Sequence, residues 1–315
     1  MYTLIAPAKI NLYLEIIGDR PDGFHELVMI MQSIDLGDRL EIQPSNSTYH
    51  RLTCSDAQLG AKEDNLAYKA AVLMSQQFPD AFASHGGVAM RLDKRIPVAA
   101  GLAGGSADAA AVLVGINLLW NLGLTQGDLQ TVAAQLGSDI PFCVSGGTAI
   151  ATGRGEQLDA LPSPHQPLWI VLAKHKSLSV STPWAYQTYR QEFGHTYVQD
   201  LADQADRARH IHSGPLVEAI AQSNTATLAA HLHNDLEAVV LPAHPQVAQL
   251  RQAFLDAGAI GAMMSGSGPS VFALCDSIEH AEQVKVTTLA TVNDPDLGCW
   301  ITKLSNNGIH LATIA

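Results

Sequence analysis

The chain has 315 residues, of which 47% are hydrophobic and 15% are charged, a composition typical of a folded globular protein. Thirty acidic against eighteen basic side chains give a formal net charge of −12, which argues against nucleic acid or an anionic membrane as the main partner. No run approaches the roughly 18 apolar residues of a membrane span, and the length suits two domains of about 150 residues each.

The cysteines and histidines predict neither a disulfide framework nor a metal centre. Four cysteines are scattered without paired spacing, at Cys54, Cys143, Cys275 and Cys299. The thirteen histidines include no His-Glu-x-x-His pattern, so we expect surface or structural histidines. Because the amino terminus also carries no export signal, a cytoplasmic protein in a reducing environment is expected.

In chain order, the first predicted element is a strand at residues 10–16, where apolar and more polar side chains alternate. Since alternate side chains of a strand share a face, Lys9 and Asn11 must project together. A second alternation, at residues 88–92, predicts a strand that runs directly into a glycine-rich segment.

Two helices are predicted after the glycine-rich segment. Apolar residues recur at helical spacing from Ala109 to Trp120, with Ser106 as the expected N-cap and Gly123 as the expected terminator. A shorter helix is predicted at residues 128–136 and ends at a glycine, so that Asp139 follows in a turn.

The second half begins after the stretch Leu161–Pro167, which holds three of the fifteen prolines. We therefore predict a domain boundary there, with domains at residues 1–163 and 164–315. Further on, the pattern predicts strands at residues 168–173 and 271–274, a helix at residues 247–257 and a glycine turn at residues 265–270. The stretch Gln187–Ser213 fits either helix or mobile surface. Mixed strands and helices in both halves favour an α+β or α/β two-layer architecture.

The glycine-rich segment is the strongest candidate for a binding site. It lies between a predicted strand and a predicted helix, where backbone N–H groups and the helix dipole can bind an anion. It matches neither a Walker A loop nor the Gly-x-Gly-x-x-Gly dinucleotide pattern. A flexible connector is the alternative interpretation. The segment consists of Pro97, Val98, Ala99, Ala100, Gly101, Leu102, Ala103, Gly104, Gly105, Ser106 and Ala107.

Three other features are ambiguous when each is taken alone. The turn around Gly266 and Gly268 could serve only to reverse the chain before a strand. Lys9 could be a solvated residue of an edge strand, and Asp139 could merely cap the turn at residues 140–141.

Taken together, four segments occur in an order that resembles the GHMP kinase superfamily, named for galactokinase and for homoserine, mevalonate and phosphomevalonate kinases. The segments are Pro7-Ala8-Lys9-Ile10-Asn11-Leu12, the glycine loop, Gly137-Ser138-Asp139-Ile140-Pro141-Phe142 and Gly266-Ser267-Gly268-Pro269. Three more resemble the branch of the superfamily whose acceptor is a cytidyl diphosphate sugar alcohol, namely Arg20-Pro21-Asp22-Gly23-Phe24-His25-Glu26-Leu27, Gly153-Arg154-Gly155-Glu156 and Asn234-Asp235-Leu236-Glu237. The likeness runs from about Ala6 to Leu274.

The resemblance implies an α+β protein of two-layer sandwiches, with a ribosomal-protein-S5-domain-2-like first domain and a ferredoxin-like second domain. It also implies an enzyme that uses ATP and Mg²⁺ and phosphorylates the 2-hydroxyl of its acceptor in the non-mevalonate route to isoprenoids. Asp139 would be the general base, and Lys9 would orient the hydroxyl and counter charge. Phosphoryl transfer suits such a pair, since it depends on positioning and charge neutralisation.

On the acceptor side, the resemblance implies a cytosine stacked between Phe24 and Tyr186 and hydrogen-bonded by His25. The other implied acceptor-binding residues are Asn11, Thr182, Gly266 and Ser267, and no protein residue is assigned as a metal ligand. Two departures from the family pattern occur. Ala107 and Asp108 stand where the family often has serine and asparagine, and Phe24 stands where tyrosine is common.

Two rival interpretations remain open. A sister kinase would act on homoserine or mevalonate, but these acceptors offer no base for aromatic residues to stack on. A non-catalytic sensor of the same fold would not need both Lys9 and Asp139. We expect a small-molecule substrate, no nucleic acid or membrane partner, and a monomer or weak homodimer.

Overall fold

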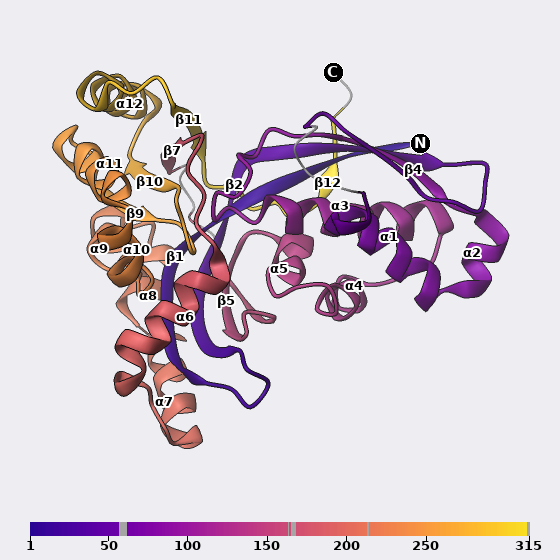
Figure 1. Cartoon of the computed structure of the whole chain (residues 1–315), viewed down its shortest axis with the longest axis horizontal. Helices are drawn as coiled ribbons and strands as arrows, with labels where there is room; N and C mark the ends of the chain where they lie inside the picture. The colour runs from indigo at the N-terminus through magenta and orange to yellow at the C-terminus, as the bar shows by residue number, and fades with distance from the viewer. Residues whose placement is uncertain (57–61, 163, 165–167, 213, 314–315) are drawn as a thin grey trace.

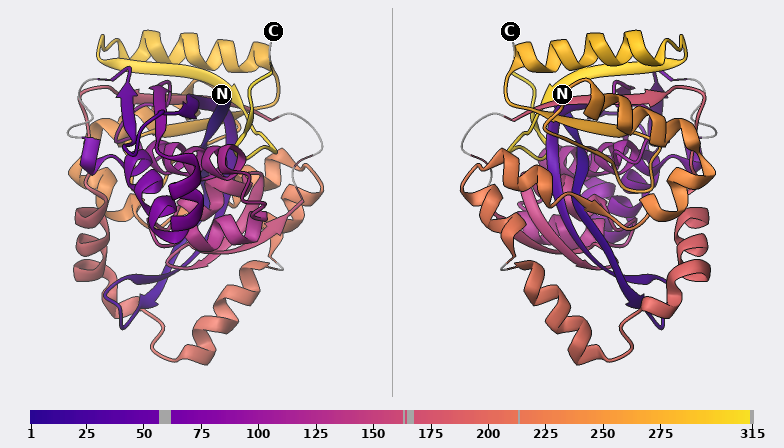
Figure 2. Two further views of the ribbon diagram at one scale, coloured as in Figure 1. Left: turned by 90° about the vertical axis from the view of Figure 1, so that its right-hand side faces the viewer. Right: turned by 90° about the vertical axis from the view of Figure 1, so that its left-hand side faces the viewer.

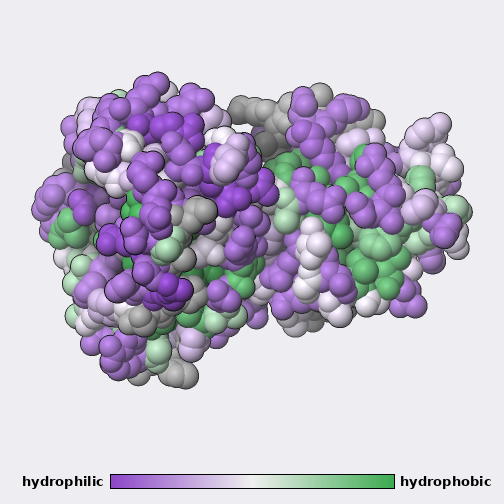
Figure 3. Space-filling view, turned by 90° about the horizontal axis from the view of Figure 1, so that it is seen from below, coloured by the Kyte–Doolittle hydropathy of each residue, from purple (hydrophilic) through white to green (hydrophobic). Residues whose placement is uncertain are grey.

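The computed structural model describes residues 1–56, 62–162, 164, 168–212 and 214–313. The molecule is elongated, and each half contains a sheet covered by helices (Figure 1). Two long strands, β1 (Tyr2–Asp19) and β2 (His25–Pro44), run between the halves and are joined by a loop that lies close to helix α6 (Thr182–Phe193). In the view from below, the surface is largely polar, and an indentation separates the two halves (Figure 3).

The first sheet is built on the antiparallel pairing of β1 with β2. Its main path has the order β12-β1-β2-β4-β3, and β5 and β6 extend it from β2. The predicted strands at residues 10–16 and 88–92 lie within β1 and β4, so both predictions are confirmed. The other bounds are β3 Arg51–Cys54, β4 Val88–Asp93, β5 Thr148–Gly153, β6 Gln157–Leu161, β8 His233–Asn234 and β12 His310–Leu311.

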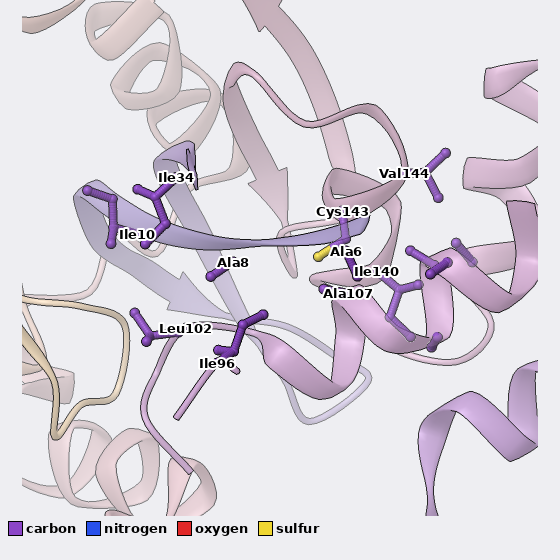
Figure 4. Close-up of a cluster of buried hydrophobic side chains, with 14 of the residues drawn as sticks. Ala6, Ala8, Ile10, Ile34, Ile96, Leu102, Ala107, Ile140, Cys143 and Val144 are labelled. Carbon is purple, nitrogen blue, oxygen red and sulfur yellow. The ribbon is translucent and has the colours of Figure 1, made fainter. Parts of the chain in front are cut away.

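Helix α3 (Gly104–Trp120) packs on β1 and β2 and carries a broad apolar surface. A Cβ at Gly115 would lie 2.9 Å from Cγ2 of Ile42, so the helix approaches the sheet too closely for a larger residue. Figure 4 shows Ala8 and Ile10 of β1 gathered with Ile34 of β2 and with Leu102 of the glycine loop. The helices around α3 are α1 Leu66–Gln77, α2 Pro79–His85, α4 Gln126–Ala133 and α5 Ile140–Ser145, with a 3-10 turn η1 at Lys62–Asp64.

The ends of α3 differ from the sequence prediction. Its N-cap is Ala103, in the left-handed conformation with φ 55°, and makes no side-chain cap hydrogen bond; Ser106 lies inside the first turn. The predicted N-cap was therefore wrong, because the loop enters the helix by a left-handed backbone rather than by a hydroxyl cap. The helix ends at Trp120, and its C-cap, Asn121, is also left-handed and lies two residues before Gly123. Helix α4 starts earlier than predicted, with Thr125 as its N-cap and Asp128 completing a capping box.

The second sheet has the strand order β11-β7-β10-β9, and every neighbouring pair is antiparallel. With helices before β9 and after β10, the chain order is β-α-β-β-α-β, which is ferredoxin-like as predicted. Helices α11 and α12 pack on this sheet. The bounds are β7 Trp169–His175, α10 Glu237–Ala243, α11 Pro245–Asp256, β9 Gly261–Met264, β10 Val271–Cys275, α12 Ile278–Val292 and β11 Leu297–Lys303.

The stretch left undecided between helix and mobile surface is largely helical. It contains the end of α6, the 3-10 turn η2 (Gly194–Thr196) and α7 (Leu201–His212), while its last residue, Ser213, lies outside the described residues. Figure 2 shows α7 at the lower end of the molecule, below both sheets. Helices α8 (Pro215–Ala221) and α9 (Thr225–Ala230) follow it in the chain. Within the described ranges, no helix has the length and apolar character needed to cross a membrane.

The predicted domain boundary falls partly outside the described residues, which lack 163 and 165–167. Two short strands from the second half of the chain, β8 and β12, pair with β1 of the first sheet. The two halves are therefore joined by strand pairing as well as by the linker.

Candidate active site

A cavity of about 740 Å³ lies where the glycine loop, the β1–β2 loop, α6 and the second glycine turn meet. This volume is within the range of small-molecule sites. With one exception, every residue predicted for the site lines this cavity. The exception is Ala107, which is fully buried within α3.

Lys9, Asn11 and Asp139 form the polar centre of the cavity. Lys9 is only 4% exposed, so it is not a solvated edge residue. Its Nζ donates a hydrogen bond to Oδ1 of Asn11 at 2.7 Å and lies 3.7 Å from Oδ2 of Asp139. The pairing register of β1 with β2 shifts between Pro7 and Lys9 and again between Asn11 and Tyr13. Such irregularities bend a strand, so they set its direction around Lys9 and Asn11. The ammonium is thus held between an amide and a carboxylate.

Asp139 does not serve as a cap. It precedes α5, but within the described chain its side chain makes no capping hydrogen bond to that helix. The next two residues, Ile140 and Pro141, are buried and anchor the turn, whereas the Asp139 side chain is 33% exposed. Its carboxylate therefore faces the cavity beside Lys9.

Every second residue of the glycine loop from Ala99 to Ala103 has a left-handed backbone conformation. Ala99, Gly101 and Ala103 have φ values of 49°, 72° and 55°, all in the left-handed region. Two of these residues are alanines, for which that region is strained. Alternation of this kind turns successive N–H groups toward one side and forms an anion-binding nest at the start of α3. A Cβ at Gly105 would meet only Leu66 Cδ1, at 3.7 Å, so that residue faces open space in the cavity.

The second glycine turn is in contact with the first. A Cβ at Gly101 would lie 2.2 Å from the carbonyl oxygen of Ser265, and Oγ of Ser265 donates to the Gly101 carbonyl at 3.1 Å. Gly266 also lies close to the polar centre, because a Cβ there would be 3.5 Å from Nζ of Lys9. The turn therefore forms part of the wall beside Lys9, beyond its role in reversing the chain. Ser267 also contacts Thr182 of α6 through a 2.7 Å hydroxyl–hydroxyl hydrogen bond.

The stretch Asn234–Glu237 braces this turn, a role that sequence reasoning missed. Nδ2 of Asn234 donates to the carbonyls of Met264 and Gly266 at 2.9 and 2.8 Å. Oε1 of Glu237 accepts the Met264 N–H at 2.8 Å. Asp235 accepts the backbone N–H of Ile16 in β1 at 2.7 Å. The polar residues Asn234, Asp235 and Glu237 were visible in the sequence, but their hydrogen-bond partners are far from them in the chain.

At the other end of the cavity, two rings lie against each other. His25 is 7% exposed, and its ring centroid is 5.1 Å from that of Tyr186 on α6. Burial, together with the charge of Arg190, lowers the pKa of the His25 imidazole. Its Nε2 is buried and has no hydrogen-bond partner among the described residues. The ring lines the cavity in its neutral form, and its Nε2 lies 3.9 Å from Oδ1 of Asp19, beyond hydrogen-bond distance.

Phe24 is 51% exposed at the cavity edge, which is unusual for a large apolar side chain. The guanidinium of Arg154 lies over its ring, with Cζ 5.0 Å from the centroid. Arg190 holds the same loop, since its Nη2 donates to the Gly23 carbonyl at 3.2 Å and its Nε to Asp19 at 2.7 Å.

A buried charge cluster beside the glycine loop was not predicted. The ammonium of Lys94 hydrogen-bonds Asp38 of β2 and Asp108 of α3. Asp38 also accepts the backbone N–H of Ile96, at 2.8 Å. Burial raises the pKa of the Asp108 carboxyl. Residues 38, 94 and 108 are brought together only by folding. The sequence alone indicated only that Asp108 departs from the family pattern, in which asparagine is frequent at this position. Other lining residues that sequence reasoning did not assign include Asn65, Leu66, Ile96, Ser138, Arg154, Gln187 and Arg190.

The comparisons with known proteins agree with this geometry. Residues 65–147 match the model of the GHMP kinases N terminal domain, and residues 216–287 match that of the GHMP kinases C terminal. The fold and the site thus define a GHMP kinase, and the chain belongs to that family.

Two relatives that are 59% identical to this chain carry the same name. The 4-diphosphocytidyl-2-C-methyl-D-erythritol kinase of Synechocystis sp. is 59% identical over 310 residues, 98% of each chain, and that of Gloeothece citriformis is equally similar over the same share. A solved structure of 4-(cytidine 5'-diphospho)-2C-methyl-D-erythritol kinase has a TM-score of 0.73 at 32% identity and covers 96% of this chain and 99% of its own. A homoserine kinase from Cytophaga hutchinsonii has a TM-score of 0.74 at 20% identity, covers 99% of this chain and 97% of its own, and shares the fold.

Proposed function

We propose that this chain is an ATP-dependent kinase that phosphorylates the 2-hydroxyl of 4-diphosphocytidyl-2-C-methyl-D-erythritol in the non-mevalonate route to isoprenoid precursors. One observation carries the proposal. A single cavity holds the Lys9–Asp139 pair, a phosphate-binding loop and an aromatic group that suits a nucleobase.

The chemistry needs one proton transfer and one displacement. Asp139 accepts the proton of the acceptor hydroxyl, whose oxygen attacks the γ-phosphorus of ATP as the bond to the β–γ bridging oxygen breaks and ADP leaves. Lys9, 3.7 Å from the base, orients the hydroxyl and neutralises charge on the transferring group. Asn11 positions Lys9 by accepting its 2.7 Å hydrogen bond.

The glycine loop binds the ATP phosphates. Its left-handed residues direct N–H groups toward the cavity, and the positive end of the dipole of α3 adds to them. Leu66, Ile96 and Val98 line the cavity near the loop and offer apolar contacts to the adenosine part of ATP.

The side chains present also suit Mg²⁺. Among the described residues no group of three acidic or histidine side chains is placed to hold a metal ion, and Mg²⁺ in kinases commonly needs only one or two protein oxygens besides the phosphates. The Ser106 hydroxyl, in the first turn of α3, lines the cavity and offers one such oxygen. Bound there with ATP, the ion would neutralise phosphate charge.

The acceptor is held at the aromatic end. Phe24 and Tyr186 stack on the cytosine, and His25, which also lines this end of the cavity, hydrogen-bonds its edge. Thr182, Gly266 and Ser267 line the wall next to Lys9. Homoserine and mevalonate have no base to occupy this end, which argues against a sister kinase.

An ADP-release assay tests the proposal. The purified chain is given ATP and Mg²⁺ with the cytidyl acceptor, homoserine or mevalonate in parallel. Turnover is expected with the cytidyl compound alone. Faster phosphorylation of homoserine or mevalonate would reject the proposed acceptor, and ATP binding without turnover of any of the three would favour a sensor.

We further propose two domains, divided at residues 163/164, in a cytoplasmic monomer or weak homodimer. All four cysteines are free, which supports a reducing environment. Sedimentation over a range of protein concentrations would measure the oligomeric state.

A further inference from the structure

Arg154 occupies a bridging position in the cavity. It lies in the turn between β5 and β6, within the stretch Gly153–Glu156. That turn packs close to the catalytic centre, since a Cβ at Gly155 would lie 2.6 Å from Cε of Met29 and 3.9 Å from Cβ of Ser138, the neighbour of Asp139. The guanidinium lies 5.0 Å over the Phe24 ring. Arg154 therefore spans the gap between the proposed general base and the proposed base-stacking residue.

The cavity contains four lysine and arginine side chains, at Lys9, Lys94, Arg154 and Arg190. Three of them make close hydrogen bonds to protein oxygens: Lys9 to Asn11, Lys94 to Asp38 and Asp108, and Arg190 to Asp19.

The guanidinium of Arg154 differs from these three. Its nearest acid is Glu156, with Nε and Oε1 3.7 Å apart, beyond hydrogen-bond distance. The other oxygen of Glu156 accepts the backbone N–H of Arg154 at 2.8 Å. Among the residues that the structure describes, the guanidinium of Arg154 makes no hydrogen bond, although it pairs with Glu156 and its charge helps to lower the pKa of the Asp22 carboxyl. Its side chain is 29% exposed, so the planar set of N–H donors remains open to a ligand.

The proposed acceptor has a diphosphate between its cytosine end and its reacting hydroxyl. We infer that Arg154 binds this diphosphate and makes the site selective for nucleoside diphosphate esters. This inference rests on the proposed function, because the cytosine at Phe24 and the hydroxyl at Asp139 define where the diphosphate lies. A guanidinium pairs two N–H groups with phosphate oxygens, a geometry that the single ammonium of Lys9 cannot supply.

The contact between Arg154 and Phe24 links the binding of the diphosphate to the stacking of the base. The same guanidinium lies over one face of the aromatic ring and near the diphosphate path, so it holds the exposed ring in place for stacking. Cytidine alone would use the ring and His25, whereas a cytidine diphosphate would use Arg154 as well.

The experiment measures binding of CDP and cytidine by titration calorimetry, with a non-hydrolysable ATP analogue saturating the nucleotide site. Arg154→Gln removes the charge, and Arg154→Lys keeps the charge without the planar fork. Arg91→Gln is the matched control, because Arg91 is 75% exposed on β4. Melting temperatures establish that each variant is folded.

The unmodified protein and Arg91→Gln are expected to bind CDP about tenfold or more tightly than cytidine, as charge-assisted hydrogen bonds would give. Arg154→Gln is expected to lose about tenfold in CDP affinity while cytidine affinity changes about threefold or less, and Arg154→Lys is expected to lie between. An unchanged ratio of CDP to cytidine affinity in Arg154→Gln would overturn the inference and leave the proposed kinase intact. If the unmodified protein neither bound CDP nor turned over the cytidyl acceptor, the proposed function would fail first.

Discussion

The nucleotide end and the acceptor end of the cavity are built differently. At the nucleotide end, polar groups already have protein partners: Lys94 hydrogen-bonds two carboxylates, and Asp38 accepts the N–H of Ile96 just before the loop. At the acceptor end, side chains are less fully engaged: Phe24 is 51% exposed, and the buried Nε2 of His25 has no hydrogen-bond partner among the described residues.

The nucleotide end is therefore a preorganised binding surface, whereas the acceptor end is completed only when its ligand binds. A strained loop keeps its shape only when its surroundings hold it firmly, which the buried charges and the second glycine turn do. The acceptor end instead gains its missing contacts when a base and a diphosphate enter. Disturbing the nucleotide end should therefore cost stability, and disturbing the acceptor end should cost affinity for the acceptor.

The largest expected effect is on stability. Lys94→Met would leave Asp38 and Asp108 buried side by side without a cation, which should lower the free energy of unfolding by about 3–5 kcal/mol. Urea denaturation would measure the loss, with exposed Arg91→Met as a control expected to change it by about 0.5 kcal/mol or less. Equal stability of the two variants would show that the charge cluster does not hold this end together.

The next effect is on turnover. Asp139→Asn should lower kcat by about a hundredfold or more, because an amide cannot accept the hydroxyl proton. The fold and ATP affinity should be retained, since the Asp139 side chain makes no capping hydrogen bond in the described chain. Steady-state kinetics and ATP titration would measure both. Near-normal kcat would remove Asp139 from the mechanism.

A smaller effect is expected on acceptor affinity. Tyr186→Ala should weaken binding of the cytidyl acceptor about five- to a hundredfold, the equivalent of roughly 1–3 kcal/mol of stacking. ATP affinity should scarcely change, because the glycine loop and Lys94 are untouched. Acceptor KM and ATP KM, measured separately, would test this. An unaltered acceptor KM would reject the stacking role of Tyr186.

The smallest effect concerns pH. Burial lowers the pKa of His25 from its ordinary value of 6.5, so the unfolded chain binds more protons than the folded one as the pH falls below that value. The contribution of His25 to stability is thus greatest above pH 6.5 and is lost on acidification. Denaturation at pH 7.5 and at pH 5.5 should show a smaller decrease for His25→Asn than for the unmodified protein. His195→Asn, at an exposed position, is the control; an equal decrease in all three proteins would contradict the expectation.

The sequence by itself determined features whose causes are local. Alternating apolar residues predicted the strands around Lys9 and before the glycine loop, because the two faces of a half-buried strand differ in polarity. The position of that loop between strand and helix predicted an anion site. The resemblance to GHMP kinases predicted the fold. The ferredoxin-like strand order of the second sheet agrees with that prediction.

Only the tertiary structure decided which distant groups meet. Asp38 lies within β2, Lys94 directly follows β4 and Asp108 lies in α3, and nothing in their spacing predicts a cluster. Ala103 caps α3 in a left-handed conformation that alanine does not favour, since contacts around the loop outweigh the local preference. Arg154 likewise reaches Phe24 only because β5 pairs with β2 and brings its turn beside the start of that strand. Local patterns follow from one segment's own chemistry, whereas these contacts depend on strand pairing between segments far apart in the chain.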